Sequence, residues 1–266
     1  MEFYVLTIFP EMIDACSGIG VLKKAIEQKK ISVQAVNIRD YTFDRHKSVD
    51  DTPYGGGVGM VMKPEPLMKA IQDTQKKSDH QCKTIFLSPQ GKTFNQNIAR
   101  ELALYHETQT DLILICGRYE GIDERICNEF IDDELSIGDY VLTGGELAAL
   151  IIVDAVSRLI PGVLGNDQSA DEDTFSGDLI KHAQYTRPYA FEGMTVPDVL
   201  LSGNHKDIYN WRLASSLIKT FFKRPDLLEQ RNFSVEEINI LTHWSEYLQK
   251  IIQHGSIHCT NSLSST

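Results

Sequence analysis

Residues 136–162 read SIGDYVLTGGELAALIIVDAVSRLIPG, and this stretch decides the fold of the chain. It predicts a polar turn, a short strand over residues 140–142 and a helix over residues 146–160. Between strand and helix stand Gly144 and Gly145, which permit φ > 0 and a close approach of a ligand to the main chain. The free N–H groups of the helix start suit a nucleoside-like ligand, whose edges need short, directional hydrogen bonds. For an isolated Gly-Gly pair, a simple strand-to-helix turn is the more common explanation, so the other segments of the chain decide.

The segments around this stretch alternate between short apolar strands and amphipathic helices. Strands are predicted over residues 3–9, 32–38, 84–87 and 112–115, and helices over residues 19–29, 64–76, 95–105 and 124–130. Such alternation is typical of an α/β fold with a largely parallel, doubly wound sheet.

The second half of the chain has a different character. Residues 161–193 show no sustained periodicity, which is typical of a functional loop or a linker. Helices are predicted over residues 205–223 and from Ser234, where a capping-box signature begins, to about Gln253. We expect the polar residues 254–266 to be a disordered tail.

Composition excludes several classes of protein. The 266 residues carry a net charge of −11, which argues against a generic nucleic-acid binder but allows a local basic face. The five cysteines are scattered, so neither a zinc site nor a disulfide framework is expected. With neither a secretion signal nor an apolar run of about 18 residues, we expect a cytoplasmic protein. The glycine-rich segments match neither a P-loop nor a Rossmann fingerprint.

Three glycine-rich segments together carry a resemblance to a known family. They are residues 54–60 (YGGGVGM), residues 116–125 (CGRYEGIDER) and the Gly-Gly stretch quoted above. They resemble the TrmD family of bacterial tRNA (guanine-N1)-methyltransferases, of the knotted SPOUT class. The similarity runs in order through nearly the whole chain and includes residues 87–91 (LSPQG), 160–165 (IPGVLG) and 200–205 (LLSGNH).

The resemblance implies a SPOUT-type parallel sheet with a deep trefoil knot, followed by a small all-helical domain. It places a catalytic domain at residues 1–162, a linker and active-site loop at 163–193, a helical tRNA-binding domain at 194–253 and the tail at 254–266. It further implies that S-adenosyl-L-methionine binds in the loops at the knot. The implied cofactor residues are Leu87, Ser88, Pro89, Gly91, Gly117, Tyr119, Gly121, Ser136, Ile137, Gly138, Tyr140, Leu142, Gly144 and Gly145.

Methylation of guanine at N1 needs a base near N1 and a cation or donor near O6. By resemblance, Asp173 is the base, Arg158 stabilises the guanine oxygen and Glu120 is linked to activity. Only the motif singles out Asp173 over the neighbouring acids at 171 and 172, which alone would read as a solvated cluster. The residues implied to bind the target guanosine are Asp50, Tyr54, Gly55, Gly56, Gly57, Gly59 and Arg118.

The resemblance also implies a homodimer with the active site at the subunit interface, tRNA as substrate and a requirement for Mg²⁺ without a dedicated protein cage. The expected reaction is methyl transfer to the guanosine at tRNA position 37, immediately 3′ of the anticodon, which supports reading-frame maintenance. Basic residues suited to phosphate contacts lie in the helical part at Lys206, Arg212, Lys219, Lys223 and Arg224. Three alternatives remain open: methylation of another RNA position, a non-enzymatic RNA-binding adaptor and a nucleotide hydrolase.

Overall fold

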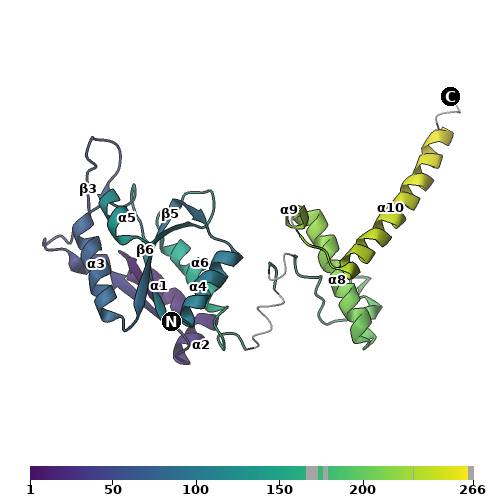
Figure 1. Ribbon diagram of the computed structural model, residues 1–266, viewed down its shortest axis with the longest axis horizontal. Coiled ribbons are helices and arrows are strands. Elements are labelled where there is room, and N and C mark those ends of the chain that lie inside the picture. Colours follow the sequence, from purple (N-terminus) through teal and green to yellow (C-terminus); the bar gives the residue numbers. More distant parts are fainter. Residues whose placement is uncertain (166–172, 176–178, 230, 263–266) are drawn as a thin grey trace. The chain divides into compact units, whose positions relative to one another are not determined.

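The computed structural model describes residues 1–165, 173–175, 179–229 and 231–262 (Figure 1). The chain divides into two compact units, Met1–Ala170 and Asp171–Thr266. Each unit has its own elements and is described by itself.

The first unit is built on a five-stranded sheet in the order β2-β1-β6-β5-β7. All of its neighbouring strands pair in parallel, as the alternation of elements predicts. The strands are β1 (Glu2–Thr7), β2 (Ser32–Asn37), β5 (Gln81–Thr93), β6 (Thr110–Cys116) and β7 (Asp133–Ser136). The pairing of β5 with β7 shifts register between Leu87 and Lys92, so the main chain bulges at the end of the sheet.

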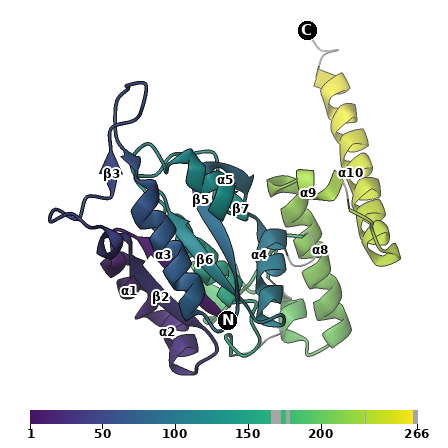
Figure 2. The ribbon, with the colours of Figure 1, turned by 60° about the vertical axis from the view of Figure 1, so that its left-hand side comes forward.

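Helices cover both faces of this sheet, and Figures 1 and 2 show α3 and α4 on opposite sides of it. The helices are α1 (Pro10–Ser17), α2 (Gly20–Glu27), α3 (Pro64–Lys77), α4 (Gln96–Ala103), α5 (Glu124–Phe130) and α6 (Glu146–Ser157). Short 3₁₀ turns η1 (Ile38–Tyr41) and η2 (Leu104–His106) and a small hairpin of β3 (Asp50–Asp51) and β4 (Val61–Met62) complete the unit.

The buried side chains of the sheet alternate between two hydrophobic clusters, one on each face. Phe3 and Val5 of β1 pack in the cluster that contains residues of α1, α2, α4 and α6. Tyr4 and Leu6 pack in the other, with residues of α3 and α5. This period of two is what a strand between two helical layers requires. The apolar helix α6 supplies much of the first cluster, including the fully buried Ile152.

Three sequence-based expectations for this unit need correction. Residues 140–142 form no strand, and β7 lies at residues 133–136 instead. Tyr140, Val141 and Leu142 are all exposed, because this segment has no neighbouring strand to pair with and forms a loop. Helix α1 was not expected, although Pro10 at its first position is a typical start signal. Strand β5 is much longer than the predicted residues 84–87.

The second unit contains a β8–β9 hairpin (Ala190–Phe191 and Met194–Thr195), η3 (Asp198–Leu201), and the helices α8 (His205–Lys223), α9 (Asp226–Glu229) and α10 (Val235–Ser262). Asn204 caps α8 by accepting from the N–H groups of Lys206 and Asp207. The predicted capping box of α10 forms in both directions between Ser234 and Glu237. Helix α10 continues past Gln253, where we expected it to end, because no proline follows and one interior glycine costs only about 1 kcal/mol.

Candidate functional site

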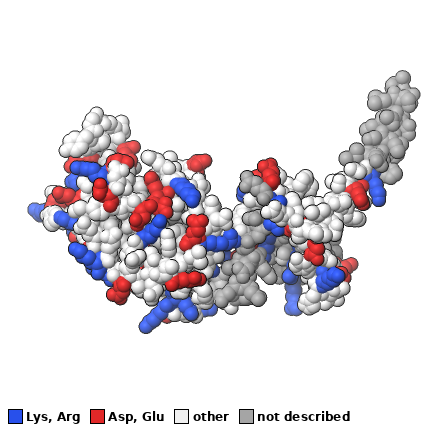
Figure 3. Space-filling model, viewed as in Figure 1, with Lys and Arg blue, Asp and Glu red and all other residues white. Residues whose placement is uncertain are grey.

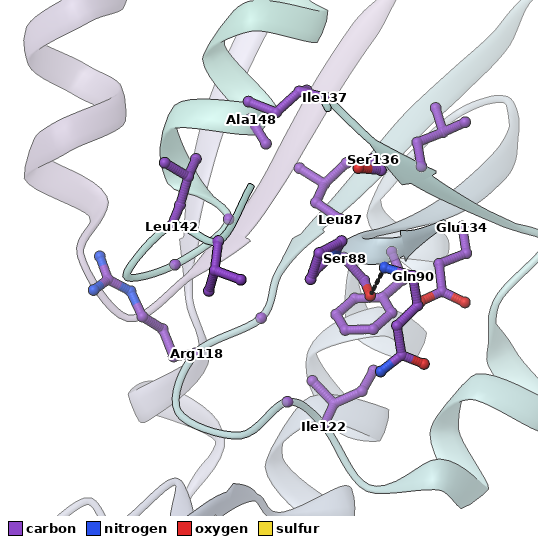
Figure 4. A pocket seen from close by; sticks show the side chains of 18 of the residues that line it. Leu87, Ser88, Gln90, Arg118, Ile122, Glu134, Ser136, Ile137, Leu142 and Ala148 are labelled. Atoms are coloured by element: carbon purple, nitrogen blue, oxygen red, sulfur yellow. Dashed lines mark hydrogen bonds between the residues drawn. The ribbon is translucent and has the colours of Figure 1, made fainter. Parts of the chain in front are cut away.

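A cavity of about 380 Å³ lies at the carboxyl ends of β5, β6 and β7 (Figure 4). Open parallel sheets bind ligands at this edge. Three segments form the wall, residues 86–90, 117–122 and 134–145 (except Asp139), together with Glu124, Cys127 and Ala148. They come from parts of the chain far apart in sequence, and the parallel sheet brings them together.

The first segment lies within β5, where the pairing with β7 shifts register between Leu87 and Lys92. The backbone N–H of Gln90 donates to Ser88 Oγ at 3.1 Å, a bond drawn in Figure 4. Ser136 plays the same part after β7, where its Oγ accepts from the Gly138 N–H at 3.2 Å. These hydroxyls are therefore occupied in shaping the two turns. The loop after β6 holds Tyr119 at φ 60°, an uncommon conformation for a bulky residue that is often found at functional sites.

The paired glycines permit close packing of main chain rather than φ > 0. Neither Gly144 nor Gly145 has a positive φ, which corrects the expectation from sequence. A Cβ on Gly145 would lie 2.7 Å from Cys116 Cα, because the start of α6 abuts the end of β6. The Gly145 N–H donates to the Gly117 carbonyl at 3.0 Å, so the two loops are joined directly.

A buried ion pair fastens the same two loops. Glu146, 1% exposed, accepts from Arg118 Nε at 3.0 Å and Nη2 at 2.8 Å, and from Thr7 Oγ1 at 2.7 Å. Arg118 Nη1 donates to the Thr143 carbonyl at 3.0 Å, and the guanidinium lies 4.5 Å from the centre of the Phe9 ring. In Figure 4 the Arg118 side chain extends away from Ser88. Arg118 thus connects β1, the loop after β6 and the start of α6.

The cysteines of this region are not poised as nucleophiles. Burial raises the pKa of the Cys116 thiol well above its usual value. Burial, with Glu124 and Glu134 nearby, raises the pKa of Cys127 to about 11. Because the thiolate is the reactive form, both side chains stay protonated and inert at neutral pH. Besides main chain, hydroxyls and apolar groups, the pocket lining includes Arg118 and the carboxylates of Glu120, Glu124 and Glu134, and this mixture suits binding of a preformed reactive cofactor.

Thirteen of the fourteen residues expected to hold the cofactor line this one pocket; Gly91 does not. Gly91 lies just outside it, where a Cβ would meet the Glu134 carbonyl carbon at 2.5 Å, so it allows β5 and β7 to approach. The pocket also contains residues that we did not predict, among them Phe86, Ile122, Cys127, Glu134 and Ala148. Ile122 and Ala148 lie in the glycine-rich segments quoted above but were not singled out there. Phe86, Cys127 and Glu134 lie outside those segments and reach the wall through their places on β5, α5 and β7.

The residues expected to bind the target guanosine fall in two places. Arg118 and the catalytic candidate Glu120 are at the pocket. Asp50, Tyr54 and the glycines 55–57 and 59 lie on the β3–β4 hairpin, whose tip is highly exposed at Tyr54 and Val58. This hairpin is bonded to the pocket loop, since the Glu120 N–H donates to the Met60 carbonyl at 2.9 Å.

The candidates Arg158 and Asp173 lie in different units. Arg158 caps the end of α6 and is exposed. Asp173 Oδ1 pairs with Lys181 Nζ at 3.0 Å in the second unit. The neighbouring acids at 171 and 172 lie outside the described residues, so their comparison with Asp173 stays a prediction.

The described residues hold no group of three or more His, Cys, Asp or Glu side chains placed to bind a metal ion. Over the same part of the chain, no helix combines the length and apolarity needed to cross a bilayer. Acidic and basic side chains are interspersed on the visible face of the first unit (Figure 3).

Comparison with known proteins relates the chain to one family. A family model described as tRNA (Guanine-1)-methyltransferase TrmD matches residues 1–230. A protein named tRNA (guanine-N(1)-)-methyltransferase from Desulfatibacillum aliphaticivorans is 50% identical over 264 residues, which cover 99% of each chain. Proteins of the same name from Bacillus cereus and Bacillus anthracis are 51% identical over 237 residues, 89% of this chain and 96% of theirs.

Proposed function

The chain belongs to the TrmD family of tRNA (guanine-1)-methyltransferases, and we propose that it methylates N1 of the guanosine at tRNA position 37 from S-adenosyl-L-methionine bound in the 380 Å³ pocket. It is a tRNA (guanine-N1)-methyltransferase. The observation that carries the proposed site is the convergence of three loops, two of them glycine-rich, on one pocket at the carboxyl edge of the sheet. A role in reading-frame maintenance follows from a target next to the anticodon.

The pocket fits the methyl donor in size and chemistry. Its volume lies at the lower end of the range of about 300–1,000 Å³ that small-molecule sites occupy. The loops of residues 117–121 and 136–145 offer main-chain groups to an adenine and a ribose, and Leu87, Leu142 and Ala148 offer apolar surface. When bound, S-adenosylmethionine supplies an electrophilic methyl group. Around the pocket, the residues of the chain hold the cofactor, exclude water and direct the guanine towards the methyl group.

We propose that Asp173 accepts the proton of guanine N1 and that Arg158 stabilises the negative charge that develops on O6. N1 becomes nucleophilic only as its proton leaves, so a positioned base and a cation act on the same transition state. The ion pair with Lys181 supports this role for Asp173, because it fixes the carboxylate at a defined place. Glu120 lies on the pocket wall beside the β3–β4 hairpin, a suitable place for a residue that orients the target base.

A homodimer with composite active sites is the proposed assembly. Leu147, Ile151, Asp154 and Arg158 are exposed on α6 at helical spacing and form one stripe. Its apolar part, with Leu147 50% and Ile151 45% exposed, is suited to burial against a second copy, and it leads along the helix to Arg158. Mixing Arg158→Ala with Asp173→Ala protein is then expected to restore part of the activity, through heterodimers with one intact site. Full activity of a verified monomer would contradict the assembly.

The remaining parts of the proposal concern the knot, the domains and the metal. We infer that the loops that meet at Gly117 and Gly145 belong to a SPOUT trefoil knot, and that the helical residues 194–253 bind tRNA after a linker at 163–193. Lys206, Arg212, Lys219, Lys223 and Arg224 supply phosphate contacts there. Any Mg²⁺ would take oxygens from water and substrate besides Glu120, since Mg²⁺ readily keeps such ligands.

The test is single-turnover methylation of tRNA transcripts with guanosine or adenosine at position 37, with the product mapped by mass spectrometry. Asp173→Asn keeps the shape and removes the base, so we expect a loss of turnover of about a hundredfold or more with cofactor affinity nearly unchanged. Asp171→Asn is the matched control and is expected to lose far less. Methylation of the adenosine-37 transcript at another guanosine would refute the assignment of the target position. Full activity of Asp173→Asn would refute the assignment of the base.

A further inference from the structure

A second cavity, of about 620 Å³, lies within the second unit and shares no residue with the cofactor pocket. Its polar wall is formed by Lys181, His182, Gln184, Tyr185, Thr186, Arg187, Tyr189 and Arg212. Three of these are cations, and none of the described residues that line the cavity is acidic. In a chain with a net charge of −11, such a concentration of positive charge favours an anionic ligand.

Aromatic rings accompany the cations. The side chains of Tyr185 and Tyr189 are 51% and 50% exposed, so each ring keeps a surface open to a ligand. Tyr185 also contacts Trp211, with ring centroids 6.1 Å apart and planes at 57°. Tyr189 donates weakly to Asp198 at 3.3 Å, which steadies its hydroxyl end. Rings beside guanidinium groups are the combination that binds unstacked RNA bases and their phosphates.

The wall of this cavity is held in place by α8. The Ile180 N–H donates to Thr220 Oγ1 at 2.9 Å, and the Ala183 N–H donates to Ser215 Oγ at 2.9 Å. Lys219 Nζ donates to the Lys181 carbonyl at 2.8 Å. A preformed wall loses little conformational freedom on binding, so the ligand gains more of the interaction energy.

We propose that this cavity binds one unstacked nucleotide of the tRNA, with its base on Tyr185 or Tyr189 and its phosphate against Arg187 and Arg212. The proposal rests on the function proposed above, which supplies the RNA. Lys181 lies on the cavity wall and also pairs with Asp173, the proposed proton acceptor. The nucleotide therefore binds next to the lysine that holds this carboxylate. The cavity is therefore a tRNA subsite that helps to position the substrate.

The experiment uses the full chain carrying Trp244→Phe, which leaves Trp211 beside Tyr185 as the one tryptophan and hence as a fluorescent reporter. An anticodon stem-loop RNA is titrated at several salt concentrations into this protein and into its Tyr189→Leu, Arg187→Met and Arg212→Met variants. Tyr247→Leu and Lys250→Met are the matched controls, because both residues are exposed on α10. Circular dichroism and S-adenosylmethionine affinity check that each variant is folded.

We expect Tyr189→Leu to weaken RNA binding about tenfold, the usual scale for loss of one base stack. Each arginine variant should reduce the salt dependence by about one phosphate contact. The RNA should perturb Trp211 fluorescence, and the controls should bind as the parent does. If the cavity variants bind RNA as tightly as the controls do, the proposed subsite is overturned. If the parent still methylates tRNA in that case, the proposed function stands.

Guanosine and adenosine monophosphate are titrated in parallel to identify the source of the nucleotide. Either mononucleotide can give a weak signal, and loss of that signal in Arg187→Met supports nucleotide binding in the cavity. This result stands even when the parent shows no tRNA methylation and the proposed function fails. Tight binding of a free mononucleotide that does not compete with the stem-loop overturns the tRNA subsite in favour of a separate small-molecule site. The absence of any signal from both RNA and mononucleotides also overturns the proposal.

Discussion

Replacement of Glu146 by alanine tests the contact that fastens the cofactor pocket. The Glu146 carboxylate is 1% exposed and accepts from Arg118 and Thr7. Removing one partner of a buried ion pair typically costs about 3–5 kcal/mol, because the other charge is left without compensation. Arg118 keeps its bond to the Thr143 carbonyl and its side chain is 17% exposed, so we take the lower end, about 3 kcal/mol.

A loss of about 3 kcal/mol lowers the melting temperature of a domain of this size by about 6–12 °C. Since Arg118 and Glu146 join the loop after β6 to the start of α6, the affinity for S-adenosylmethionine should fall as well. Thermal melting followed by circular dichroism and calorimetric titration of the cofactor measure the two effects. The second unit serves as an internal reference, because Glu146 belongs to the first.

The matched control is Asp40→Ala, which breaks an ion pair with Lys47 at 2.8 Å in the same unit. Both of its side chains are more than half exposed, so the expected cost is at most about 1 kcal/mol. The double variant Glu146→Met with Arg118→Met removes both charges and should recover much of the stability lost by Glu146→Ala. Equal melting temperatures for Glu146→Ala and Asp40→Ala would refute the reasoning.

Two further changes probe the pocket and the helical unit. Gly144→Val should abolish detectable cofactor binding in calorimetry while the chain still folds, because a Cβ there would overlap the Arg118 side chain; unchanged affinity would remove this glycine from the site. Glu237→Gln should destabilise the second unit near neutral pH but have little effect in acid. Although burial opposes ionisation of Glu237, bonds from Ser234 and Arg231 hold its pKa below the ordinary value of 4.5. The contribution of Glu237 to stability is therefore full above pH 4.5 and is lost as the pH falls through the lowered pKa of the folded state. An equal loss of stability by Glu237→Gln in urea titrations at pH 3 and pH 7 would contradict this role.

Local sequence signals predicted most of the elements, because their causes are local. The capping box at Ser234 and Glu237 fixed the start of α10, and Pro64 marked the first residue of α3. Four of the five strands of the sheet were found for a similar reason, since buried parallel strands are continuous apolar runs, whereas β7 was not predicted. Tyr140–Leu142 shows where this reasoning fails. An apolar run indicates burial against something, and at residues 140–142 the exposed side chains border a pocket instead of a neighbouring strand.

The candidate site could be outlined from sequence but its supporting contacts could not. The close approach of a ligand to Gly144 and Gly145 stays a prediction; the structure shows both glycines packed against Arg118 and Cys116 instead, and the expected positive φ was wrong. The bond network of Glu146 with Arg118 and Thr7 joins residues separated by 28 and 139 positions. No periodicity or spacing rule connects residues so distant, and only the folded sheet brings the end of β1 to the start of α6.

Glu120 shows how the same packing links the substrate hairpin to the pocket. Its N–H is bonded to the Met60 carbonyl, and its side chain lies so close to Gly59 that a Cβ at that glycine would overlap the carboxylate. Gly59 also has φ 95°, a conformation that other residues rarely adopt. The position therefore needs glycine for two independent reasons, its own backbone conformation and the space that Glu120 occupies. Because the hairpin and the pocket wall meet at this carboxylate, a change in the hairpin on tRNA binding would reach Glu120 through direct contact.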